Sequence, residues 1–201
     1  MKKVLFILLI CTLLISSMAF AKEFPDVAST HWAHQYISDL SDQKVINGYE
    51  DGTYRPNGTV TRAEFIKLIV CTSKERMFFS DLSEYYFGPY SNWYDKYFFV
   101  SKDYLSFGFD EQHNAPITRI EMSRVVQDFA KADGLVSKGT KKNFTDVETL
   151  CDLDKDAVNS VQDYGIINGY EDGSFRPANK MTRAEVSAVI SRYIQARGGI
   201  D

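Results

Sequence analysis

Cysteine is scarce in this chain, and so are the patterns of a nucleotide or metal site. The 201 residues include 3 cysteines, 5 prolines and 3 histidines. A disulfide-rich scaffold is therefore excluded. Cys71 and Cys151 could form one bridge, but no spacing argument selects it. The sequence contains no glycine-rich loop of the P-loop type and no nucleophile with an organised base.

An excess of positive charge is also missing. The chain has 23 basic and 27 acidic residues, for a formal net charge of −4 at pH 7. This balance excludes a general nucleic-acid-binding surface. An anionic ligand would therefore have to be held by local groups and not by the overall field of the protein.

The N-terminus lacks an apolar run long enough to span a bilayer. Lys2 and Lys3 precede an apolar stretch over residues 4–15, and small residues follow up to Ala19-Phe20-Ala21. This order predicts a secretory signal peptide over residues 1–21, with an uncleaved membrane anchor as the alternative. We expect a secreted protein that is not an integral membrane protein after cleavage.

The chain does contain an internal repeat. Segments that begin at Phe24, Phe79 and Phe144 each lead to a Thr-Arg pair, and residues 45–56 are nearly identical to residues 166–177. The middle copy is shorter and lacks the Asp-Gly turn and the Arg-Pro pair of the other two. This self-similarity divides the chain into three repeats, over residues 22–76, 77–141 (degenerate) and 142–201.

Each repeat is expected to fold as helix–loop–helix. Apolar residues at helical spacing follow Trp32, and this first helix should end near Lys44. The second helix starts with a capping box at Thr61 and Glu64, which recurs in the other two repeats. One helix pair cannot bury its apolar face alone. We therefore predict a mainly α fold, with three repeats packed around a central helical bundle and a last helix that stops at residues 198–199.

Three arginines occupy an electrostatically unfavourable position. Arg62, Arg119 and Arg183 each follow the capping threonine, where the positive end of the helix dipole disfavours a cation by about 0.3–1 kcal/mol. A helix start can also bind an anion, and a guanidinium can grip a carboxylate with two hydrogen bonds. One interpretation is thus a bound carboxylate. The alternative is an ion pair with an acidic residue of an adjacent repeat.

The order of these motifs resembles the S-layer homology family. It consists of Phe-x-Asp-Val, a tryptophan-containing helix, Gly-Tyr-Glu-Asp-Gly, Tyr/Phe-Arg-Pro and Thr-Arg-Ala-Glu, and the middle repeat keeps part of it. The resemblance implies three repeats arranged as an intrachain pseudo-trimer. It also implies that grooves between repeats bind secondary cell-wall polymers that carry ketal-linked pyruvate, with the motif arginine on the pyruvyl carboxylate.

The resemblance assigns binding roles to the motif arginines, the groove glycines, the loop acids and one helix aromatic. These residues are Arg62, Arg119, Arg183, Gly48, Gly108, Gly169, Asp51, Asp172 and Trp32. Trp93 is the counterpart of Trp32 in the middle repeat, and Leu153 takes that place in the third. Because the middle repeat has no loop acid, we expect one or two working grooves.

Calcium binding and catalysis are weaker interpretations. Asp152, Asp154 and Asp156 alternate as at the start of an EF-hand, but Ala157 stands where that loop needs glycine. Two histidines, His31 and His34, have no evident third metal ligand. We predict no metal, no cofactor and no enzymatic activity.

The predicted function is non-covalent attachment to the cell wall. The expected partner is a secondary cell-wall polysaccharide or a peptidoglycan-linked polymer, and the expected location is the cell wall, S-layer or cell surface. We expect a monomer that does not bind nucleic acid. The alternative is a module that docks an envelope protein or has a purely structural role, with the extra aromatic residues of the middle repeat between Tyr85 and Tyr97 as the docking surface.

Overall fold

A computed structural model describes residues 23–73, 92–136 and 143–199, and within them the fold is all-helical. The helices are α2 (His34–Asp42), α3 (Arg62–Thr72), α5 (Asp95–Ser101), α6 (Arg119–Ala132), α7 (Asp152–Asp163) and α8 (Arg183–Ala196). These described residues form isolated β-bridges but no sheet. The prediction of a mainly α fold is confirmed. The predicted signal peptide and the start of the middle repeat at Phe79 lie outside the described residues.

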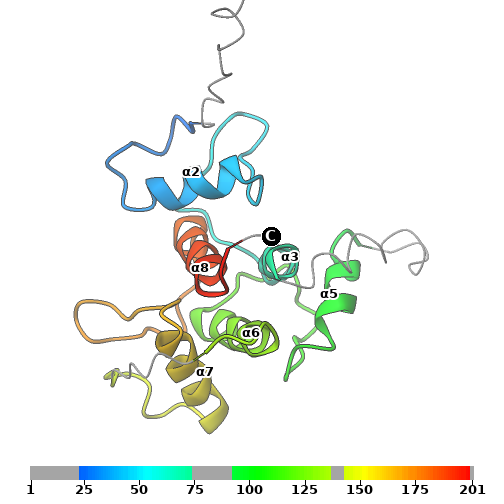
Figure 1. The fold of residues 1–201 in the computed structure, drawn as a ribbon, viewed down its shortest axis with the longest axis vertical. Coiled ribbons are helices and arrows are strands. Elements are labelled where there is room, and N and C mark those ends of the chain that lie inside the picture. The colour runs from blue at the N-terminus through cyan, green and yellow to red at the C-terminus, as the bar shows by residue number, and fades with distance from the viewer. Residues whose placement is uncertain (1–22, 74–91, 137–142, 200–201) are drawn as a thin grey trace, which may run out of the picture.

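The helices form two concentric layers. The second helices of the three repeats, α3, α6 and α8, make a central bundle, and α2, α5 and α7 surround it (Figure 1). Each outer helix packs against the inner helix of a different repeat: α2 against α8, α5 against α3, and α7 against α6. This cyclic exchange joins the three helix pairs into an intrachain pseudo-trimer, as predicted.

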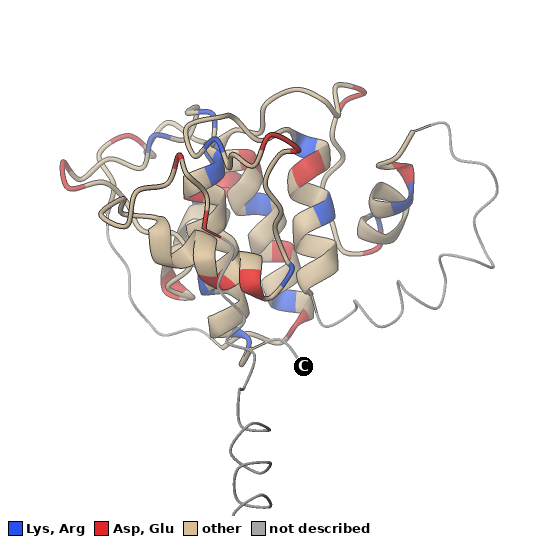
Figure 2. Cartoon of the chain, turned by 90° about the horizontal axis from the view of Figure 1, so that it is seen from above, with Lys and Arg blue, Asp and Glu red and all other residues tan. Residues whose placement is uncertain are grey.

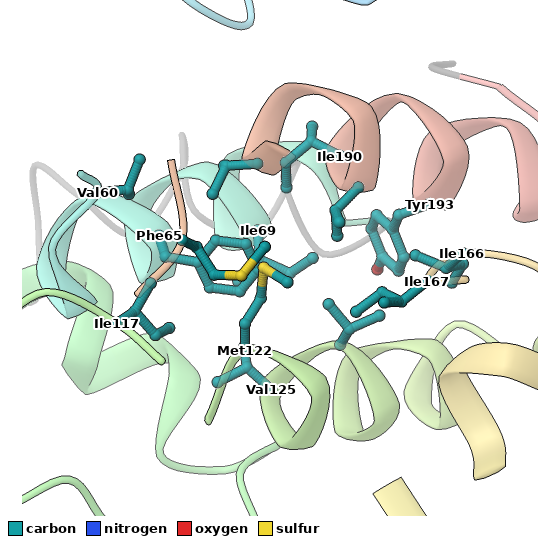
Figure 3. Close-up of a cluster of buried hydrophobic side chains, with 14 of the residues drawn as sticks. Val60, Phe65, Ile69, Ile117, Met122, Val125, Ile166, Ile167, Ile190 and Tyr193 are labelled. Atoms are coloured by element: carbon teal, nitrogen blue, oxygen red, sulfur yellow. The ribbon is translucent and has the colours of Figure 1, made fainter. Parts of the chain in front are cut away.

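The core lies between the three inner helices. Phe65 and Ile69 of α3, Met122 of α6, and Ile190 and Tyr193 of α8 point toward one another and are fully buried (Figure 3). Burial of each such side chain contributes about 1.5–3 kcal/mol relative to an exposed one. Because every inner helix contributes to one shared cluster, the bundle stabilises all three repeats together.

A closed ring of backbone hydrogen bonds joins the segments that lead into the inner helices. The amide of Val60 donates to the carbonyl of Met181 (3.0 Å), that of Met181 to Ile117 (3.0 Å), and that of Ile117 to Val60 (2.9 Å). All three side chains are buried. The ring therefore buries one residue of each repeat while its backbone amide stays hydrogen-bonded. It also fixes the starts of the three inner helices relative to one another.

All three inner helices begin with the predicted capping box. Thr61 accepts a hydrogen bond from the amide of Glu64, and the Glu64 carboxylate accepts one from the amide of Thr61. The same exchange occurs at Thr118 and at Thr182. The threonine and the glutamate of the motif thus serve the start of the helix.

The end of the last helix, the two cysteines and the lengths of the helices bear on further expectations from the sequence. Helix α8 ends at Ala196, and Gly198 and Gly199 adopt φ of 100° and 104°, as the predicted stop requires. Cys71 and Cys151 do not form a disulfide. In the part of the chain that the structure describes, no helix has both the length and the apolar character needed to cross a membrane.

Loss of a capping threonine should lower stability. We expect Thr61→Ala to lower the free energy of unfolding by about 1 kcal/mol, because the amide of Glu64 loses its acceptor. The exposed Thr59 is a matched control, since Thr59→Ala should change stability by less than about 0.5 kcal/mol. Urea denaturation measures both, and equal stabilities of the two variants would contradict the capping role.

Candidate functional site

The loop between the two helices of a repeat is shaped by an aspartate from the start of that repeat. The Asp26 carboxylate accepts hydrogen bonds from the amides of Tyr54 (2.8 Å) and Arg55 (2.7 Å). Desolvation opposes ionisation of Asp26, but the backbone hydrogen bonds outweigh it and lower its pKa. Arg55 is held at a φ of 57°, in the left-handed region. Asp146 holds Phe175 and Arg176 in the same way.

A second contact stiffens the tip of this loop. Asp51 accepts hydrogen bonds from Thr53 and from the Arg55 guanidinium (2.8 Å), and these bonds hold its pKa well below the usual range. The Arg55 guanidinium also lies 3.9 Å from the ring centroid of Tyr49. In the third repeat, Asp172, Ser174, Arg176 and Tyr170 make the same arrangement. In each of these two loops, the predicted acid therefore holds an arginine against the tyrosine ring.

Gly48 permits a close approach within the loop. A Cβ atom at Gly48 would lie 2.4 Å from the Phe24 ring and 2.7 Å from the carbonyl oxygen of Thr53. Gly169 is still tighter, at 2.0 Å from the Phe144 ring. A side chain cannot fit at such distances without movement of the loop. The glycine therefore lets its two neighbours in the chain, residues 47 and 49 in the first repeat, reach the arginine of another repeat.

Arg183 meets this loop of the first repeat. Its Nε donates to the carbonyl of Tyr54 (2.7 Å), and one terminal nitrogen donates to the carbonyl of Asn47 (3.0 Å). Its guanidinium lies 4.9 Å from the ring centroid of Tyr49 and 4.3 Å from that of Tyr54. Among the described residues no ion pair joins Arg183 to an acid. The guanidinium is therefore oriented by neutral groups.

A cavity opens beside Arg183. It has a volume of about 320 Å³ and lies between α3, α8 and the loop that contains Asn47. Polar and aromatic lining groups include Glu64, Lys67, Trp93 and Arg183. We call this cavity the Arg183 pocket. Its volume is at the lower end of the range of about 300–1,000 Å³ that is typical of ligand sites.

Arg119 occupies the equivalent position against the third repeat but is covered. Its residue exposure is 6%, and it donates to the carbonyl of Asn168 (2.5 Å). Tyr170 and Phe175 lie on the guanidinium, each with its ring centroid 4.9 Å away, and the Tyr170 hydroxyl donates to Glu185 (3.0 Å). Burial lowers the pKa of Arg119, and its Nε has no hydrogen-bond partner among the residues that the structure describes. Tyr170 and Phe175 thus cover this arginine from solvent.

Arg62 is neutralised by acids of the second repeat. Its guanidinium pairs with Glu121 (2.5 Å) and Asp110 (2.5 Å) and donates to the carbonyl of Gln112 (3.2 Å). The hydrogen bond to Glu121 raises the pKa of Arg62 despite its partial desolvation. The pairing with an adjacent repeat, which the sequence left open as an alternative, therefore describes Arg62. It describes neither Arg119 nor Arg183.

The helix starts themselves are closed to an anion, contrary to the expectation. The amide of Arg183 donates to the carbonyl of Gly58 (2.8 Å), and that of Ala184 to Pro56 (2.9 Å). Loops of neighbouring repeats cap α3 and α6 in the same way. The capping threonine takes the next amide. An anion at this site must therefore be bound by the side chains.

The tryptophans and glycines that were predicted to share a role do not have the same surroundings in every repeat. Trp93, at 51% exposure, lines the Arg183 pocket, whereas Trp32 is 58% exposed beside His31 at the start of α2. A Cβ atom at Gly108 would meet nothing within 4 Å in the described parts of the chain, so Gly108 does not share the close approach of Gly48. Trp93 was named from the sequence only as the counterpart of Trp32, and Tyr49 and Lys67 were missing from the predicted site. The repeated Gly-Tyr pair was a signal for Tyr49, but nothing local indicated Lys67.

The alternating acids that resemble the start of a calcium-binding loop connect two helices instead. Asp154 pairs with Arg124 (2.5 Å), and Asp156 accepts a hydrogen bond from Gln127 (2.6 Å). Both acids thus tie α7 to α6. In the described ranges, no three His, Cys, Asp or Glu side chains come together as potential metal ligands.

Comparison with known proteins identifies the repeats. Residues 23–66 and 143–187 match the model of the S-layer homology domain. The chain is 27% identical over 92% of its length to an amylopullulanase of Thermoanaerobacterium thermosulfurigenes. It is 25% identical over 87% to an S-layer protein of Bacillus thuringiensis subsp. finitimus, and 29% identical over 75% to a cellulosome-anchoring protein of Acetivibrio thermocellus. It spans only 10%, 21% and 35% of these three relatives, respectively.

The two kinds of glycine should respond differently to a methyl group. We expect Gly169→Ala to destabilise the protein by about 1–3 kcal/mol, because its Cβ would overlap the Phe144 ring. Gly108→Ala should be close to neutral, since its surroundings are open. Thermal unfolding of both variants tests this, and similar melting temperatures would refute the close-approach role of Gly169.

Proposed function

Since this chain carries S-layer homology domains, we propose that it attaches non-covalently to the cell wall by binding a secondary cell-wall polysaccharide. The family match and the S-layer relatives support a location at the cell surface. The name of the cellulosome-anchoring relative supports an anchoring role. The observation that carries the proposal is the Arg183 pocket, where an unpaired guanidinium and an exposed tryptophan line one cavity.

The chemistry of the pocket favours an acidic sugar. The Asn47 and Tyr54 carbonyls orient the Arg183 guanidinium, which can still donate to a carboxylate. The Trp93 ring offers an apolar surface for the non-polar face of a sugar. Figure 2 shows acidic and basic residues interspersed along helices and loops, so selectivity must come from these local groups. We propose a ketal-linked pyruvate as the carboxylate that Arg183 binds.

The three arginine sites are not equal in this proposal. The Arg183 pocket is open, Arg119 is 94% buried under Tyr170 and Phe175, and Arg62 is already paired with two acids. We therefore propose the Arg183 pocket as the main polymer site. The Arg119 site is a second site that needs rearrangement of Tyr170, and the Arg62 site has a structural role.

We also propose that the chain is a monomeric anchor and not an enzyme. The amylopullulanase relative is matched over 10% of its length, so its name says little about the shared segment. We retain the division into repeats over residues 22–76, 77–141 and 142–201 as part of this proposal. The family model itself matches the first and third of them.

Co-sedimentation with cell-wall sacculi tests the proposed partner. The protein should pellet with intact sacculi and remain in solution with sacculi that have been stripped of secondary polymer. Equal binding to both preparations would identify peptidoglycan as the target instead. Binding to neither would contradict wall anchoring and favour the docking of an envelope protein.

Replacement of the pocket arginine should weaken wall binding selectively. We expect Arg183→Ala to lower affinity for intact sacculi at least about tenfold, because charge-assisted hydrogen bonds to the carboxylate are lost. Arg62→Ala is the matched control at the equivalent position, and its affinity should stay within about twofold of wild type. Equal losses in both variants would refute the assignment of the pocket.

A further inference from the structure

The Arg183 pocket contains a second cation, Lys67, which makes no ion pair with the described part of the chain. Lys67 of α3, Arg124 of α6 and Ala188 of α8 occupy the same helical position, five residues after the motif arginine. Arg124 pairs with Asp154, which lies on the outer helix α7 that packs against α6. The equivalent outer helix against α3 is α5. When Trp93 is matched with Leu153 in the sequence, Tyr94, the residue before α5, stands in the place of Asp154.

Lys67 therefore lines the pocket with no carboxylate partner in the ranges that the structure describes. Among the described residues no ion pair involves Lys67. Its ammonium lies 5.8 Å from the ring centroid of Trp93, and both residues line the cavity together with Arg183. The cation is thus positioned over the same ring that we propose as the sugar platform.

The remaining charge in the pocket does not neutralise both cations. Glu64 is the acid that lines the cavity, and its carboxylate accepts hydrogen bonds from the amide (2.7 Å) and the hydroxyl (3.0 Å) of Thr61. Two cations and one engaged carboxylate leave a net positive pocket. A single ligand carboxylate on Arg183 would leave Lys67 without an anionic partner.

We propose that Lys67 binds a second anionic group of the ligand, so that the glycan segment in this pocket carries two separate acidic groups. The inference rests on the proposed function and narrows its ligand to a dianionic sugar segment. One acid binds Arg183, and the other, a carboxylate or a phosphate, binds Lys67 beside the Trp93 ring. The other two arginine sites lack this feature, since Arg124 is paired and Ala188 carries no charge.

A double-mutant cycle on binding to intact sacculi tests the number of acidic groups. Lys67→Met should lower affinity about fivefold, and Lys67→Arg should restore it to within about twofold of wild type. If two separate groups are bound, the losses multiply. The double variant with Arg183→Ala should then bind at least about fiftyfold more weakly than wild type. Lys102→Met is the matched control, because Lys102 lies on the Phe99 ring outside this pocket.

Two results would overturn the proposal. One is wild-type affinity of Lys67→Met. The other is a double variant no weaker than Arg183→Ala alone, because one shared carboxylate would then contact both cations. Either result leaves wall anchoring intact as long as the wild-type protein still distinguishes intact from stripped sacculi. Loss of that distinction would instead contradict the proposed function. Melting temperatures of all variants show whether they are folded.

Discussion

The rest of the structure depends on the ring of backbone hydrogen bonds among Val60, Ile117 and Met181. Each residue precedes a capping threonine, so the ring fixes where all three inner helices start. Because the ring closes on itself, the backbone N–H and the carbonyl of each of the three residues are both hydrogen-bonded. The motif arginines, which follow the threonines, are consequently placed around one end of the bundle and against the loops of other repeats.

Every candidate site therefore combines residues from more than one repeat. Arg183 comes from the third repeat, while Asn47, Tyr49 and Tyr54 come from the first. The cyclic exchange of outer helices has the same effect, since it brings Trp93 of the second repeat to the pocket. Sites of this kind exist only when the repeats are assembled, so the stability of the bundle and the geometry of the candidate sites have the same origin.

The sequence predicts what is encoded locally and misses what depends on the exchange. Capping boxes lie within four residues, so Thr61 and Glu64 were assigned correctly, and periodicity revealed the helices. The loop glycine was recognised, although its partner Phe24 is distant in the chain. The pairing of Arg62 with Glu121 could not be predicted, because it depends on which repeat faces which. The same reason explains why Trp93 replaces Trp32 in the pocket.

The surroundings of the three motif arginines differ, and they can differ because the ring that supports them consists of backbone hydrogen bonds. Backbone hydrogen bonds between Val60, Ile117 and Met181 do not require particular side chains, so the residues around each arginine can change without loss of the bundle. Two acids neutralise Arg62, the Tyr170–Glu185 hydrogen bond covers Arg119, and an open cavity remains at Arg183. In a repeat protein of this kind, near-identical motifs therefore establish the fold. The charges and rings contributed by the neighbouring repeat decide whether the arginine of each copy is paired, covered or open to a cavity.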